Sequence, residues 1–111
     1  MEQRFNKLVR DKIPQKIDNN GEVAVTRTLN DEEYSQELNK KLLEESEEVI
    51  KAIDSSQTLE ELADVLEVIE SIGVLNGYTL DDIIEAAKLK KEKRGGFSKR
   101  IFLVKTYPKI K

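Results

Sequence analysis

Residues 42–53 read LLEESEEVIKAI and residues 59–75 read LEELADVLEVIESIGVL. Both stretches place apolar side chains three and four residues apart, which is the spacing of an amphipathic α-helix. The apolar stripe of the first helix includes Ile53, and the apolar arc of the second includes Leu62 and Leu66. Because only a few residues separate the two stretches, the helices are expected to pack side by side in opposite directions. The sequence therefore predicts a helical protein built around an antiparallel helix pair.

Capping signals set the ends of three predicted helices. Asn30 followed by Glu33, Thr58 followed by Glu61 and Thr79 followed by Asp82 each have the spacing of a capping box. Glycine follows each of the last two helices, as Asn76-Gly77 and Gly95-Gly96. The predicted helices therefore span residues 31–54, 59–76 and 80–94.

Four acidic side chains lie on or beside the apolar stripes of the first two helices. With successive residues about 100° apart around the axis, Glu45 falls inside the stripe of the first helix and Glu48 at its edge. Glu61 falls inside the apolar arc of the second helix and Asp64 on its margin, whereas Glu67 faces outward. Glu61 has another explanation as a capping-box partner of Thr58. Because desolvated carboxylates cost several kcal/mol each without an opposing charge, the four acids predict a bound cation.

Composition restricts which cation is expected. The chain contains no His and no Cys, so imidazole and thiolate ligands are excluded. Mg²⁺ or Mn²⁺ suits a site made of carboxylate oxygens, and such an ion also binds phosphate oxygens. One ion or two can be held by four carboxylates.

The ends of the chain have a different character. Residues 5–18 form a basic arm with a turn or two of helix, which Pro14 is expected to interrupt. Residues 22–29 and 101–106 are rich in β-branched side chains and predict a short two-stranded antiparallel ribbon. The whole chain, residues 1–111, is expected to form a single domain. Because the apolar fraction is only 38 %, a second copy of the chain is expected to complete its core.

Basic side chains are expected to supplement the metal ion in binding phosphate. Two candidates lie in the N-terminal arm and two beside a pair of glycines that lets backbone approach a ligand. The alternatives are a solvated arm and an ordinary helix C-terminus. The predicted substrate-binding residues are Lys7, Arg10, Lys91, Arg94, Gly95 and Gly96.

The order of the acidic motifs resembles a known superfamily. Glu44-Glu45-x-x-Glu48 followed by Glu61-x-x-Asp64 is similar to the EExxE…ExxD pattern of the all-α nucleotide pyrophosphohydrolases, which include MazG and phosphoribosyl-ATP pyrophosphohydrolase. The stretches 6-NKLVRDKIP-14, 59-LEELADVLE-67 and 93-KRGGF-97 resemble the short phosphoribosyl-ATP pyrophosphohydrolase-like branch. The resemblance extends from residue 5 to about residue 104.

The resemblance implies an all-α, dimeric or tetrameric enzyme in which Glu45, Glu48, Glu61 and Asp64 hold Mg²⁺. By analogy, it hydrolyses a nucleoside triphosphate between the α and β phosphates and releases pyrophosphate, with the branch often regarded as clearing non-standard nucleotides. The predicted catalytic residues are Glu44, Glu45 and Glu48, and either Glu44 or Glu48 is a candidate general base by position. Base and sugar preference stay open.

Two alternatives accompany this prediction. One is the phosphoribosyl-ATP pyrophosphohydrolase of histidine biosynthesis, and the other is a non-catalytic helical dimerisation module with solvated acids. A formal net charge of -3 and few aromatic residues argue against nucleic-acid binding. No stretch approaches the roughly 20 apolar residues of a membrane span, so a cytoplasmic protein is expected.

Overall fold

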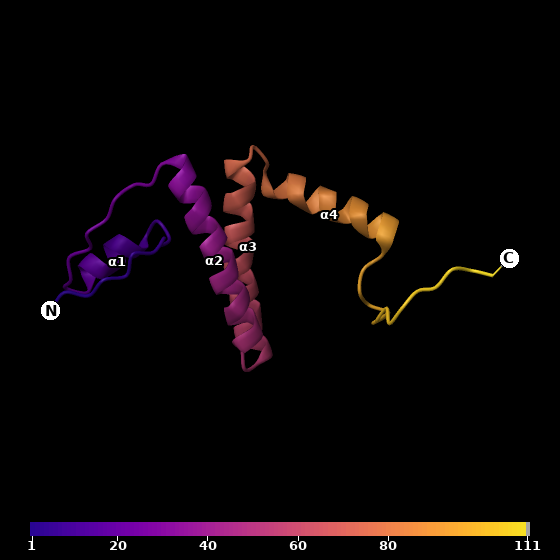
Figure 1. The fold of residues 1–111 in the computed structure, drawn as a ribbon. Helices are drawn as coiled ribbons and strands as arrows, with labels where there is room; N and C mark the ends of the chain where they lie inside the picture. Colours follow the sequence, from indigo (N-terminus) through magenta and orange to yellow (C-terminus); the bar gives the residue numbers. More distant parts are fainter. Residues whose placement is uncertain (111) are drawn as a thin grey trace. The chain divides into compact units, whose positions relative to one another are not determined.

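Residues 1–110, which the computed structural model describes, form four helices and no strand (Figure 1). The helices are α1 (Ile13–Asn19), α2 (Asp31–Lys51), α3 (Ser55–Leu75) and α4 (Leu80–Arg94). The chain divides into two compact units, one of Met1–Leu80 and one from Asp81 onward, and each is described by itself. The all-α prediction is confirmed.

The short helix α1 begins where the sequence places a proline. Pro14 lies in its first turn, where the missing N–H has no helical partner in any case. Pro14 therefore starts a helix in the N-terminal arm, whereas the sequence prediction had it interrupting one. The segment before it, up to Lys12, is not helical.

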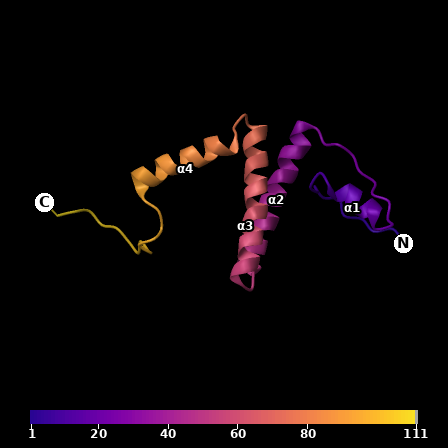
Figure 2. The same ribbon diagram turned by 180° about the vertical axis from the view of Figure 1, so that it is seen from behind.

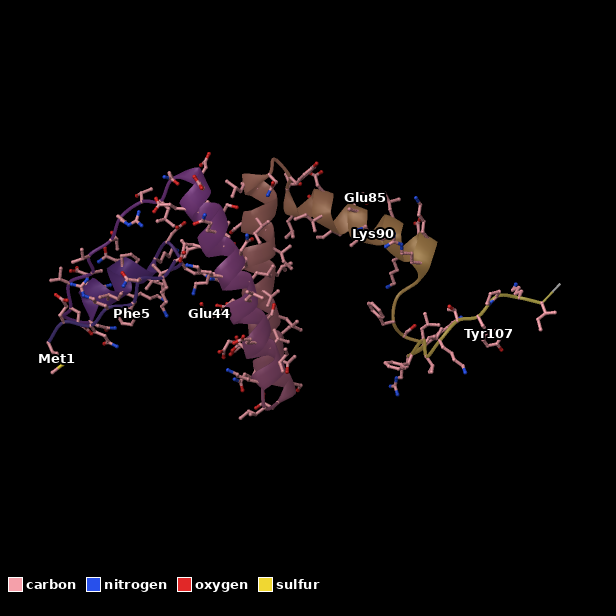
Figure 3. The ribbon with its side chains drawn as sticks, viewed as in Figure 1. Met1, Phe5, Glu44, Glu85, Lys90 and Tyr107 are labelled. Carbon is pink, nitrogen blue, oxygen red and sulfur yellow. The ribbon has the colours of Figure 1, made fainter. Side chains whose placement is uncertain are left out.

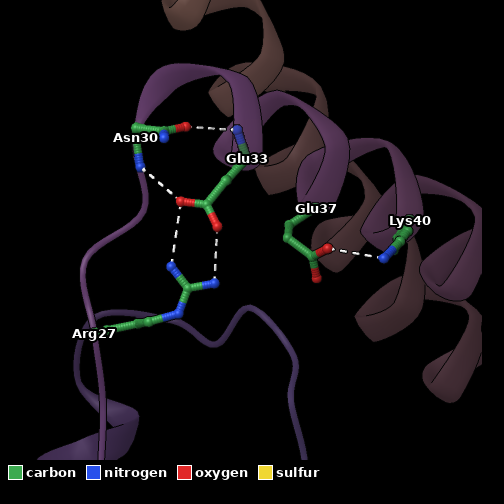
Figure 4. A network of polar contacts seen from close by, with 5 residues as sticks. All are labelled: Arg27, Asn30, Glu33, Glu37 and Lys40. Atoms are coloured by element: carbon green, nitrogen blue, oxygen red, sulfur yellow. Dashed lines mark hydrogen bonds and ion pairs between the residues drawn. The ribbon is translucent and has the colours of Figure 1, made fainter.

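The start of α2 confirms the predicted capping box. The Asn30 side chain accepts a hydrogen bond from the Glu33 backbone N–H at 2.9 Å, and the Glu33 carboxylate accepts one from the Asn30 N–H at 3.5 Å (Figure 4). The Arg27 guanidinium donates two hydrogen bonds to the same carboxylate, of 3.2 and 2.8 Å. The Arg27 hydrogen bonds are the main reason that the pKa of Glu33 is lowered. The N-terminus of α2 is thus held by both backbone and side-chain contacts.

Helix α3 begins one turn earlier than the sequence indicated. Asp54 is its N-cap and accepts a hydrogen bond from the Gln57 N–H at 2.8 Å. The Thr58 hydroxyl donates to the Asp54 carbonyl at 2.8 Å, so Thr58 lies inside the helix. The predicted capping box of Thr58 and Glu61 is therefore wrong, because the earlier cap at Asp54 starts the helix first. Glu61 is consequently an interior helix residue rather than a capping partner.

The end of α3 matches the Asn76-Gly77 signal. Gly77 has φ +89°, the Gly77 N–H donates to the Val74 carbonyl at 3.0 Å, and the Tyr78 N–H donates to the Gly73 carbonyl at 2.8 Å. These two bonds satisfy carbonyls that a helix end leaves unpaired, and the left-handed residue between them favours glycine.

Helices α2 and α3 lie side by side and run in opposite directions, as both views show (Figures 1 and 2). Residues 52–54 join them, so the predicted antiparallel pair is confirmed. Among residues 1–110, the only apolar side chains that are buried are Leu38 of α2 and Val68 of α3. The pair thus has a thin core.

A second set of apolar side chains on the same two helices is exposed. We call these residues the apolar face: Leu43 and Ile50 of α2, and Leu59, Leu62 and Leu66 of α3. Each is between 47 % and 82 % exposed, although Leu62 and Leu66 belong to the apolar arc that the sequence predicts. Ile53, predicted within the α2 stripe, lies beyond the helix end and is exposed. Part of the apolar surface of the helix pair is therefore uncovered.

The predicted two-stranded ribbon is absent from the described residues. Residues 22–29 belong to the first unit and residues 101–106 to the second, and neither range contains a strand. Val23, Val25 and Ile101 are largely exposed. β-branched side chains stabilise a strand mainly by packing on a sheet surface, and residues 1–110 contain no sheet. Neither range is a strand by itself, and pairing between the two stays a prediction.

The second unit contains most of α4, and this helix ends at Gly95. Gly95 has φ +80° and its N–H donates to the Lys91 carbonyl at 2.8 Å, which satisfies one carbonyl of the last turn. Gly95 thus supplies the predicted positive φ after the helix. No helix among the described residues is both long and apolar enough to cross a membrane.

Candidate metal centre

Three of the four predicted carboxylates meet where α2 and α3 pack together. Glu45 comes from α2, and Glu61 and Asp64 come from successive turns of α3. One carboxylate oxygen from each lies within 4.8 Å of the others, and all three residues are half-buried. We call Glu45, Glu61 and Asp64 the carboxylate cluster.

Burial and neighbouring charges both act on the pKa values of the carboxylate cluster. Burial raises the pKa of Glu45, and the negative charge of Asp64 raises it further. Burial likewise raises the pKa of Glu61, again with Asp64 as the next contribution. Both shifts have the same physical origin, because partial desolvation and like charges disfavour the ionised form. A cation at the cluster would relieve both effects.

Glu48 lies outside the carboxylate cluster but close enough to influence it. It is exposed on α2, one turn beyond Glu45, and its negative charge contributes to the raised pKa of Glu61. Glu44 projects from the side of α2 that faces residues 1–12, which we call the N-terminal segment (Figure 3). Its carboxylate pairs with the Lys41 ammonium at 3.3 Å. Of the four predicted ligands, Glu48 is the one that this geometry leaves apart.

Arg10 is the basic residue that reaches the carboxylate cluster. Its Nη2 donates to Asp64 Oδ1 at 2.6 Å, and its Nη1 lies 4.0 Å from Glu67 Oε1. The two partners in the first contact are 54 positions apart in the sequence. The N-terminal segment is thereby tied to α3 at a cluster carboxylate.

Lys41 is a site residue that the sequence reasoning missed. Its side chain is only 17 % exposed, and its positive charge acts on Glu45 to lower that residue's pKa, against the larger effect of burial. Lys41 precedes Glu45 by four residues, so the two side chains share a helix face. That spacing is a signal that would have identified Lys41.

A cavity of about 250 Å³ opens beside the carboxylate cluster, between the N-terminal segment and the helix pair. Its wall includes Arg10, Lys41, Glu45 and Asp64. Glu67 also lines it, which corrects the prediction that Glu67 faces outward, because it lies one turn after Asp64 on the same face of α3 and the N-terminal segment packs over that face. The remaining lining residues are Leu8, Val9, Asp11, Tyr34, Leu38, Val68 and Ser71.

A second hollow, of about 490 Å³, lies along the far ends of the same helices. It shares Tyr34, Glu67 and Ser71 with the first cavity but contains no member of the carboxylate cluster. Because the chemistry of the site depends on the carboxylates, the smaller cavity is the better candidate despite its size.

The other five predicted substrate-binding residues are all exposed. Lys7 is exposed, with its ammonium 5.7 Å from the centre of the Phe5 ring. Lys91, Arg94, Gly95 and Gly96 belong to the second unit, where all four are exposed. Their role in substrate binding stays a prediction.

The residues of the carboxylate cluster fit a hard divalent cation. All three offer oxygen, the ligand type that Mg²⁺ and Mn²⁺ prefer, and their closeness is unfavourable without a positive charge. Arg10 provides one such charge to Asp64, but its side chain is 55 % exposed and the contact is correspondingly weak. The donor set and the electrostatics therefore both suit a metal ion.

One comparison with known proteins gave a match. A protein-family model described as phosphoribosyl-ATP pyrophosphohydrolase matches residues 5–91, which include most of the N-terminal segment, the carboxylate cluster and most of α4. No curated protein and no solved structure matches the chain.

Proposed function

The chain belongs to the phosphoribosyl-ATP pyrophosphohydrolase family, within the MazG-like all-α pyrophosphohydrolases, and from this premise we propose that it hydrolyses a nucleoside triphosphate to the monophosphate and pyrophosphate. Membership makes the protein a hydrolase acting on the acid anhydride of a nucleotide-like substrate. Membership also argues against the alternative of a non-catalytic dimerisation module. We propose three further properties: the bond that is cleaved, the class of triphosphate and the identity of the metal ion.

The meeting of Glu45, Glu61 and Asp64 within 4.8 Å is the observation that carries the proposal. We assign these three residues, with Glu48 as a fourth, to Mg²⁺ or Mn²⁺. When bound, such an ion neutralises phosphate charge and lowers the pKa of water. Phosphoryl transfer depends mainly on position and charge, so the residues around the cavity need only hold the substrate in place.

The proton of the attacking water is assigned to a carboxylate outside the cluster. Glu44 and Glu48 are both exposed and close along α2 to Glu45, and either can accept a proton. The Lys41 ammonium lies 3.3 Å from the Glu44 carboxylate and so helps to position it on this side of α2. Arg10, and Lys7 from the same N-terminal segment, are assigned to the phosphates, as are Lys91 and Arg94 beside Gly95 and Gly96.

Phosphoribosyl-ATP is a second candidate substrate, which the description of the matching family favours. It carries the same triphosphate group, so both candidates use the same bond cleavage and the same carboxylate cluster. The two differ in the part of the substrate that lies beyond the phosphates. Removal of non-standard nucleotides is the physiological role proposed for the first candidate, and the cytoplasm is its proposed location.

A screen for pyrophosphate release tests these assignments. The metal-free protein is supplied with Mg²⁺ and with standard triphosphates, modified triphosphates and phosphoribosyl-ATP in turn. Preference for one of the nucleoside triphosphates supports the proposal, whereas release from phosphoribosyl-ATP alone favours the second candidate. Asp64→Asn should abolish release, and Glu47→Gln, on an exposed position of α2, is the matched control. Release of orthophosphate in place of pyrophosphate would contradict the proposed bond.

We also propose that the chain self-associates, as a homodimer or homotetramer, through the apolar face. Leu43, Ile50, Leu59, Leu62 and Leu66 lie on the two helices that carry the carboxylate cluster, and all are exposed. A surface that is the same on both copies can pair with itself about a two-fold axis. Covering it would supply the apolar burial that Leu38 and Val68 alone do not.

A further inference from the structure

Arg10 occupies a position that conflicts with a metal ion acting alone. Its guanidinium lies 2.6 Å from a carboxylate of the cluster, so it stands beside the place where a divalent cation is expected. Two cations at a separation of a few ångströms repel one another strongly unless an anion lies between them. The cluster therefore accommodates Arg10 or an ion more easily than both.

A polyphosphate would remove this conflict. Its oxygens bind a divalent ion on one side and a guanidinium on the other, and arginine matches the geometry of a phosphate group well. Arg10 lies on a segment that precedes the first helix, and its carbonyl accepts a hydrogen bond from the Ile13 N–H at 3.0 Å. The side chain can therefore change partner without the unfolding of a helix.

We propose that Arg10 transfers from Asp64 to the substrate phosphates once a divalent ion has entered the carboxylate cluster. The N-terminal segment then acts as a clamp that holds polyphosphate only in the presence of the ion. This inference rests on the proposed function and deepens it, because it links the two ligands of the same site. Metal and polyphosphate binding are thereby cooperative, and each strengthens the other by the same factor.

Arg10→Gln separates the two halves of the proposal because it removes the charge but keeps a polar side chain. Without the competing guanidinium, Mn²⁺ alone should bind the metal-free protein roughly two- to fivefold more tightly, the range expected for an exposed ion pair. With saturating Mg²⁺, the non-hydrolysable analogue α,β-methylene-ATP should bind about tenfold more weakly, since a charge-assisted contact to phosphate is lost.

The metal half is measured with the free Mn²⁺ signal in electron paramagnetic resonance, and the analogue half by calorimetry, both on the full chain. Arg4→Gln is the matched control, because Arg4 lies in the same segment and pairs at 3.0 Å with Glu2 instead of with the cluster. It should leave both affinities unchanged.

Weaker or unchanged Mn²⁺ binding by Arg10→Gln would overturn the proposal, because Arg10 would then not compete with the ion for Asp64. Equal binding of α,β-methylene-ATP by the variant and the parent protein would overturn it as well. Both results leave the proposed hydrolysis and the metal centre standing, although equal binding would also remove Arg10 from the residues assigned to the phosphates. A parent protein that binds no Mn²⁺ at all would instead remove the metal centre itself, and the clamp with it.

Discussion

The α2–α3 pair has two sides that are both incomplete in one chain, but for opposite reasons. The carboxylate cluster brings three carboxylates within 4.8 Å, and burial, followed by the charge of Asp64, raises the pKa of Glu45 and Glu61. The apolar face leaves Leu43, Ile50 and the leucines of α3 in contact with water. The carboxylate cluster lacks an opposing positive charge, and the apolar face lacks a surface that would bury it.

The difference shows what each side needs. A cation relieves the first side, because it opposes charges that the fold has already gathered. A second copy would relieve the second side, because burying apolar surface is the main favourable contribution to folding and association. The proposals therefore give the same two helices a metal ion on one side and a second copy of the chain on the other.

The largest effect is expected from neutralising the carboxylate cluster. Glu45→Gln, Glu61→Gln and Asp64→Asn should each lower kcat at least 100-fold, in line with the loss of a group that binds the reacting complex. Helix content by circular dichroism should not change, because each substitution removes repulsion and keeps size. Full activity in any two of the three variants would separate the cluster from catalysis.

Glu48→Gln sharpens the same test. Glu48 is exposed and lies outside the cluster, although it is the fourth predicted ligand. A loss as large as that of Glu45→Gln would make Glu48 a ligand of the bound state, whereas a loss below about tenfold would limit it to an electrostatic or proton-accepting role.

The double substitution Leu62→Asp and Leu66→Asp is expected to prevent self-association through the apolar face. Four introduced charges per dimer should prevent burial of the face, so light scattering after size exclusion should give the mass of one chain. Val23→Asp, at another exposed apolar position of the first unit, is the control and should keep the parent mass. Circular dichroism checks that the double variant stays helical. An unchanged mass in a folded double variant would contradict self-association through this face.

A smaller effect is expected from pH in the absence of metal. The pKa values of Glu45 and Glu61 in the folded protein are raised above the ordinary 4.5, so the folded state holds these protons more tightly than the unfolded state. The resulting stabilisation is present below pH 4.5 and is lost as the pH rises through the raised values. Urea unfolding in EDTA should therefore show a smaller loss over this range for Glu45→Gln than for the parent protein. An identical pH dependence would mean that Glu45 is not desolvated.

Much of this picture could be predicted from local sequence. The capping box at Asn30, the turn at Gly77 and the facing of Glu45, Glu61 and Asp64 all depend on residues within one or two helical turns. Helical periodicity reports such relations directly. The start of α3 was misplaced because two capping sequences overlap there, and local patterns do not rank them.

Contacts between distant parts of the chain could not be predicted in the same way. Arg10 reaches Asp64 from a segment without periodicity, and the same side chain lies 4.0 Å from Glu67, so Glu67 lines a cavity that helical periodicity does not predict. The two β-branched segments lacked a sheet surface to pack against, so composition alone did not make them strands. Pairings of this kind depend on tertiary structure that a single sequence does not encode locally.

Thermal unfolding of the metal-free protein with and without Mg²⁺ tests the central claim most directly. A divalent ion bound by the carboxylate cluster should stabilise the parent protein by about 2.7 kcal/mol at 100 times its Kd, and should do little for Asp64→Asn. The same unfolding curve with and without Mg²⁺, or equal stabilisation of the parent protein and Asp64→Asn, would show that the three carboxylates do not form a metal centre.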